Sequence, residues 1–126
     1  MVPDKRCVDA LMDALFDLTP EVRYVAVYED GDLSMRQRPG IGQASAADSD
    51  RYEELLVNPT LLKLTAQRGD IDCGGLRYVV VRYGAFYQLV VPTNRGHVSI
   101  AFEPREGPIP YTSRILELLR EHGLTT

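Results

Sequence analysis

Apolar and polar residues recur with two different periods along this chain, and the changes of period divide it into helices and strands. Between Asp4 and Thr19, apolar residues recur every three to four positions, as in a helix with one buried face. Residues 22 to 29 and 33 to 38 alternate with a period of two, and Asp30-Gly31 between them suits a type I′ hairpin turn. The pattern predicts a helix, a central strand and a solvated edge strand.

A long helix is predicted over about residues 49 to 68. Asp50 and Glu53 have the D-x-x-E spacing of a helix start, and Gly69 can supply the positive φ that ends a helix. Asn58-Pro59 interrupts the pattern, so we expect a kink or a restart of the helix there.

The apolar side chains of this helix allow two arrangements. In a regular helix, one side would face the core, with Tyr52, Leu55, Leu56, Pro59, Leu62 and Ala66. Val57, Leu61 and Leu64 would then form a second apolar stripe on the opposite side. A rotation at Pro59 would instead merge both sets into a single core face.

Three further strands are predicted as an antiparallel meander. They cover residues 76 to 83, 85 to 92 and 97 to 103, with Gly84-Ala85 suited to a type II′ turn. Short turns between successive strands make them neighbours in the sheet. A last helix begins at Thr112 or Ser113 and ends at Gly123.

Composition narrows the possible partners. A chain of 126 residues fits one domain, and its formal net charge of −4 disfavours nucleic acid and anionic lipid as partners. The sequence has no signal-peptide pattern and no apolar run of membrane-spanning length, so we expect a cytoplasmic protein without a membrane partner. Cys7 and Cys73 are too few for a secreted disulfide framework and are expected to be reduced.

No group of residues predicts a catalytic, cofactor or metal site. Asp70, Asp72 and Cys73 are too few for a metal site at fixed spacing, and they fit a turn. His97 and His122 lie at element ends, which favours surface or capping roles over catalysis. We therefore expect a protein that is not an enzyme and holds no cofactor or metal.

The order helix, strand, strand, helix, strand, strand, strand, helix resembles the roadblock family of dynein light-chain-like and small-GTPase-associated domains. The resemblance covers nearly the whole chain and implies one roadblock-like, profilin-like α+β domain over residues 1–126. It implies a five-stranded antiparallel sheet in the order 2-1-5-4-3, with the long helix on one face and the terminal helices on the other. Family members are generally not enzymes, and several act as scaffolds or regulators of small GTPases.

The resemblance also implies a homodimer, because members of the family pair their third strands and pack their long helices together. A valine-rich strand at a sheet edge would promote aggregation unless another chain paired with it, which supports the same expectation. The implied partners are a second copy, a small GTPase or another roadblock-like protein. The predicted dimer interface consists of Leu76, Tyr78, Val79, Val80, Val81, Arg82 and Tyr83 on the strand and Val57, Leu61 and Leu64 on the helix.

The alternative is a small-molecule sensor of the PAS or GAF type. It would hold its ligand in a pocket between the sheet and the long helix. The tyrosines on or near the sheet could line that pocket with rings and hydroxyls. They are Tyr24, Tyr28, Tyr78, Tyr83 and Tyr87.

Overall fold

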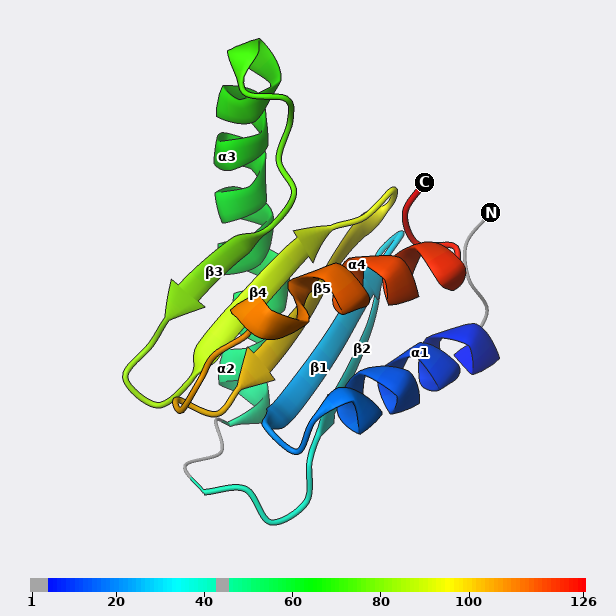
Figure 1. The fold of residues 1–126 in the computed structure, drawn as a ribbon, viewed down its shortest axis with the longest axis vertical. Helices are drawn as coiled ribbons and strands as arrows, with labels where there is room; N and C mark the ends of the chain where they lie inside the picture. The colour runs from blue at the N-terminus through cyan, green and yellow to red at the C-terminus, as the bar shows by residue number, and fades with distance from the viewer. Residues whose placement is uncertain (1–4, 43–45) are drawn as a thin grey trace.

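The computed structural model, which describes residues 5–42 and 46–126, has five antiparallel strands in one sheet. Their order across the sheet is β2-β1-β5-β4-β3, which confirms the order that the resemblance implied (Figure 1). The strands are β1 (Val22–Glu29), β2 (Asp32–Gln37), β3 (Val79–Arg82), β4 (Tyr87–Pro92) and β5 (Gly96–Phe102). The two edges of the sheet are therefore β2 and β3.

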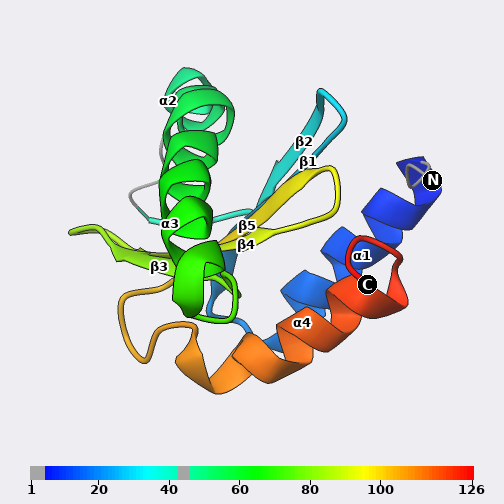
Figure 2. The same ribbon diagram turned by 90° about the horizontal axis from the view of Figure 1, so that it is seen from above.

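Helices cover the two faces of the sheet unequally. On one face lie α1 (Lys5–Leu18) and α4 (Thr112–Glu121), and on the other α2 (Ala47–Tyr52) and α3 (Asn58–Asp72), so the predicted placement of the helices is confirmed (Figure 2). A short 3-10 turn, Ile109–Tyr111, leads into α4. The large apolar core lies between the sheet and the α1/α4 pair. The α2/α3 side has a much smaller apolar cluster and leaves room for polar side chains.

The backbone angles of the turn residues show which turn types close two of the hairpins. Asp30 has φ 50° and Gly31 has φ 87°, so the turn has the two positive angles that the type I′ prediction requires. Gly84 does not have a positive φ, so the predicted type II′ turn is wrong. The β3–β4 connection is instead closed by Tyr83, whose N–H donates to the carbonyl of Phe86 at 2.9 Å.

The long helical segment contains a wide π turn, Glu53–Val57, between α2 and α3. The Asn58 N–H donates to the carbonyl of Glu53, five residues back. Pro59 has no N–H, and in a regular α-helix its ring would crowd the carbonyl four residues earlier. The wide turn accommodates that ring, so the expected irregularity at Asn58-Pro59 appears as an inserted π turn.

The π turn changes which side chains face the sheet. Glu54 and Asn58 are fully buried, whereas Leu55 and Leu56 are 44% and 52% exposed. The predicted core face is therefore wrong for these leucines, and also for Tyr52, because the wider turn shifts the angular positions of the side chains before Pro59.

The element ends that differ most from the prediction belong to the long helix and to β3. The helix continues to Asp72 rather than 68, and the positive φ angles belong to Gly74 and Gly75. Gly69 lies inside the helix, and glycine is needed there because an added Cβ would approach the Gly75 carbonyl carbon to 3.1 Å. The strand expected over residues 76 to 83 is shorter, Val79–Arg82, because only these residues pair with β4.

No helix in the described ranges 5–42 and 46–126 is both long and apolar enough to cross a bilayer.

Candidate functional site

Glu54 is at the centre of a buried hydrogen-bond network between the helical segment and the sheet. Its Oε1 lies 2.8 Å from Nε2 of His97 and accepts a bond from Asn58 Nδ2 at 3.0 Å. Its Oε2 accepts bonds from the hydroxyls of Ser99 at 2.6 Å and Tyr24 at 2.9 Å. All five side chains are buried. Protein groups thus form the hydrogen bonds with the Glu54 carboxyl group that water would form if it were exposed.

The local geometry of each element explains how the network forms. Glu54 and Asn58 are four residues apart, so both side chains point to the same side of the helical segment. His97 and Ser99 are two residues apart on β5 and therefore share a face of the sheet. Gln88 on β4 extends the network by donating to Asn58 Oδ1 at 3.2 Å. The network joins the centre of the sheet to the start of α3.

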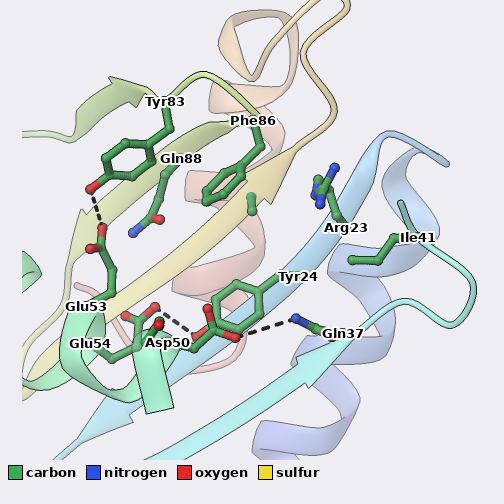
Figure 3. A pocket seen from close by; sticks show the side chains of 12 residues that line it. Arg23, Tyr24, Gln37, Ile41, Asp50, Glu53, Glu54, Tyr83, Phe86 and Gln88 are labelled. Atoms are coloured by element: carbon green, nitrogen blue, oxygen red, sulfur yellow. Dashed lines mark hydrogen bonds between the residues drawn. The ribbon is translucent and has the colours of Figure 1, made fainter. Parts of the chain in front are cut away.

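A pocket of about 260 Å³ lies beside this network and is partly open to solvent. Its walls come from the sheet, the helical segment, the β3–β4 turn and the segment after β2, which contributes Ile41 (Figure 3). Tyr24 lies on the sheet, Asp50 and Glu53 lie on the helical segment, and Tyr83 and Phe86 lie at the β3–β4 turn. Side chains far apart in sequence therefore surround one small space.

Burial and neighbouring carboxylates together shift the pKa values of three groups in this pocket. The Tyr83 hydroxyl donates to Glu53 Oε1 at 2.8 Å, and burial, this bond and the Glu53 and Glu54 charges raise the pKa of Tyr83 to about 12. Burial raises the pKa of Glu53, the Tyr83 bond lowers it, and the Glu54 and Asp50 charges raise it further. Burial and the charge of Glu54 also raise the pKa of Tyr24. Neighbouring negative charge therefore helps to raise the pKa of all three groups.

Arg23 is a cation in the pocket wall whose charge is compensated by the protein. Its side chain is 5% exposed and forms an ion pair with Glu103 at 3.2 Å. It also donates to the carbonyl of Gly42 at 2.8 Å, and its guanidinium lies 5.5 Å from the centre of the Phe86 ring. These contacts hold the side chain in place and offset its positive charge.

The strand part of the predicted dimer interface lies at one edge of the sheet. No strand in the described part of the chain pairs with the outer edge of β3. Tyr78 and Val80 pack against the large core. Arg82 is exposed, and the remaining members, Leu76, Val79, Val81 and Tyr83, are half-buried.

The backbone of β3 presents hydrogen-bonding groups to the outside. Tyr83 and Phe86 form a hydrogen-bonded pair, and in an antiparallel ladder such pairs alternate with pairs that share no backbone bond. In this register Val81 and Val79 bond to β4, while the N–H and C=O groups of Val80 and Arg82 point outward. Outward groups of this kind are what a further strand would bind.

The helix part of the predicted interface is an apolar stripe that begins at Val57, the last residue of the π turn, and continues along α3. Leu64 is 61% exposed, whereas Val57 and Leu61 are half-buried. The interpretation in which a single core face includes Leu64 is therefore wrong. Ile71 was not among the predicted interface residues, but it continues the stripe at helical spacing and is 75% exposed. We call Val57, Leu61, Leu64 and Ile71 the α3 stripe.

His97 lies in a different environment from the one predicted, and Glu54 was not among the predicted site residues. The predicted surface or capping role of His97 is wrong. β5 is the central strand, and the His97 ring is 1% exposed because it lies against Glu54 of the helical segment that covers this face. The alternation of His97, Ser99 and Ala101 with Val98, Ile100 and Phe102 could have revealed a polar inner face. His122 fits its predicted capping role, since Nδ1 lies 2.8 Å from the carbonyl of Leu118.

The prediction of a turn is wrong for Asp70 and Asp72, which lie in the last turn of α3, and Cys73 follows the helix. Asp72 pairs with Arg68 at 2.7 Å and lies 3.3 Å from the Cys73 sulfur. Within residues 5–42 and 46–126, no three or more His, Cys, Asp or Glu side chains are grouped so that they could hold a metal ion.

Comparison with known proteins does not assign the chain to a family. A scan against protein-family models finds no match, and neither does a search of curated proteins.

Proposed function

We propose that this protein is a non-enzymatic interaction domain that forms a homodimer through β3 and the α3 stripe. The observation that supports the proposal best is the outer edge of β3. There the backbone groups of Val80 and Arg82 point outward. The helix that precedes β3 in the chain exposes Leu64 and Ile71.

A second copy of the chain fits this edge because antiparallel pairing of two identical strands is self-complementary. Each β3 would offer the other the same outward donors and acceptors around a two-fold axis. The two sheets would then continue into one another, and neither would keep a free β3 edge.

The α3 stripe supplies apolar area that a four-residue strand lacks. A 15-residue helix is about 22 Å long. A specific interface buries about 800 Å² on each partner, which two packed helices together with one strand pair can provide. The exposed Leu64 and Ile71 side chains would become covered in such a dimer.

Light scattering coupled to size-exclusion chromatography tests the proposal at micromolar concentration. We expect the wild type to have twice the 14.1 kDa mass of one chain. Leu64→Glu places a charge in the α3 stripe and should give a folded monomer, because Leu64 is exposed within the protomer. Lys63→Glu is the matched control, since Lys63 is exposed on the same helix but lies outside the stripe. A monomeric wild type would refute the homodimer.

Regulation of a small GTPase, a roadblock-like partner and a cytoplasmic location stay predictions from the sequence analysis. A pull-down from the native host, searched for a small GTPase, tests the first of them.

A further inference from the structure

The pocket beside the Glu54 network is formed within one chain, so its occupancy can be tested whether or not the chain dimerises. Its volume of about 260 Å³ is below the roughly 300–1,000 Å³ of sites for drug-sized ligands. A molecule that fits it is therefore small.

The charge in the pocket favours a cation. Asp50, Glu53 and the buried Glu54 all line the pocket on its helical side. Arg23 contributes a positive charge to the opposite wall, but Glu103 offsets that charge at 3.2 Å. The side chains that line the pocket therefore carry a net negative charge.

Aromatic rings provide the second feature that suits an organic cation. The rings of Tyr83 and Phe86 contact each other edge to face, with centroids 5.4 Å apart, and both line the pocket. Tyr24 faces the same space from β1 (Figure 3). Aromatic faces attract cations and also bury the apolar part of a ligand.

We propose that this pocket binds a small organic cation, a primary amine on a short or flat apolar body. Its ammonium group lies at Glu53, and its apolar body lies against Tyr24 and Phe86. Glu53 suits this role because it is half-buried at the pocket wall, where a charge-assisted hydrogen bond is stronger than in open water.

Two-dimensional NMR titration of the labelled protein tests the proposal. The probes are tyramine, phenethylamine and agmatine, and 4-hydroxyphenylacetate serves as the acid that matches tyramine in its ring. We expect at least one amine to produce saturable shifts of the Glu53, Tyr83 and Phe86 amide signals at millimolar concentration. The matched acid should produce none.

Glu53→Gln is the decisive variant, because glutamine keeps an oxygen for the Tyr83 hydroxyl but removes the charge. It should weaken amine binding about tenfold or more. Asp17→Asn removes one exposed carboxylate on α1, across the sheet from the pocket, and should leave the affinity unchanged. The spectrum of each variant shows whether it is folded. The proposal is overturned if no amine shifts the pocket signals, if the acid binds as tightly, or if Glu53→Gln binds as well as the wild type.

Discussion

Oε1 of Glu54 lies 2.8 Å from Nε2 of His97, and both side chains are almost completely buried. The contact joins the helical segment to the middle of the sheet by polar groups, in a layer that has a small apolar cluster. The stability of this layer therefore depends on hydrogen bonds that solvent cannot replace.

Glu54→Ala should destabilise the protein strongly. It removes the acceptor for the hydroxyls of Tyr24 and Ser99 and for the Asn58 amide, and it leaves these buried donors unsatisfied. We expect a loss of about 3–5 kcal/mol in the free energy of unfolding, measured by urea denaturation. Glu53→Ala, which changes a half-buried neighbour, is the control and should cost less. Equal losses would show that the network does not hold the layer together.

Glu53 should make the stability depend on pH in a defined direction. Burial raises its pKa above the ordinary 4.5, so between pH 4.5 and the raised value the native state keeps a proton that the unfolded state has lost. The Glu53 contribution to stability is thus present at low pH and is lost as the pH rises through this window.

Urea denaturation of the wild type and Glu53→Gln, at several pH values from about 4 to about 7, measures this effect. Glutamine does not titrate, so the variant should gain stability relative to the wild type as the pH rises. A relative gain by the wild type would contradict the predicted direction.

Proline substitutions in β3 should separate dimer formation from folding. Arg82→Pro removes an outward N–H from an exposed position, so it should weaken the homodimer about tenfold or more while the protomer stays folded. Val80→Pro removes the other outward N–H, but Val80 also packs against the core. Val81→Pro is the control, because the Val81 N–H faces β4. Its loss removes a hydrogen bond within the sheet and should unfold the protomer more than Arg82→Pro does. Sedimentation velocity and circular dichroism measure the two effects.

The features that the sequence predicts correctly depend on short-range chemistry and on the order of elements. Asp30-Gly31 takes the predicted turn because both residues tolerate positive φ. The sheet order follows once the resemblance supplies the topology, which the alternating patterns alone do not determine.

The Glu54 network was not predicted because it depends on long-range packing. Its members Tyr24, Glu54, Gln88 and His97 come from four separate elements. The π turn before Pro59 also changes the helical periodicity on which the predicted core face of Leu55 and Leu56 rested. An apolar pattern with a period of 3.6 cannot reveal such an insertion.

Amide hydrogen exchange at β3 tests the homodimer most directly, because it observes the proposed strand pairing itself. At concentrations where the wild type is dimeric, we expect at least one of the outward amides of Val80 and Arg82 to be protected, together with the inward amides of Val79 and Val81. In Leu64→Glu, the outward amides should exchange rapidly while the inward ones stay protected. Rapid exchange of both Val80 and Arg82 in the wild type, beside protected Val79 and Val81, would contradict pairing through this edge.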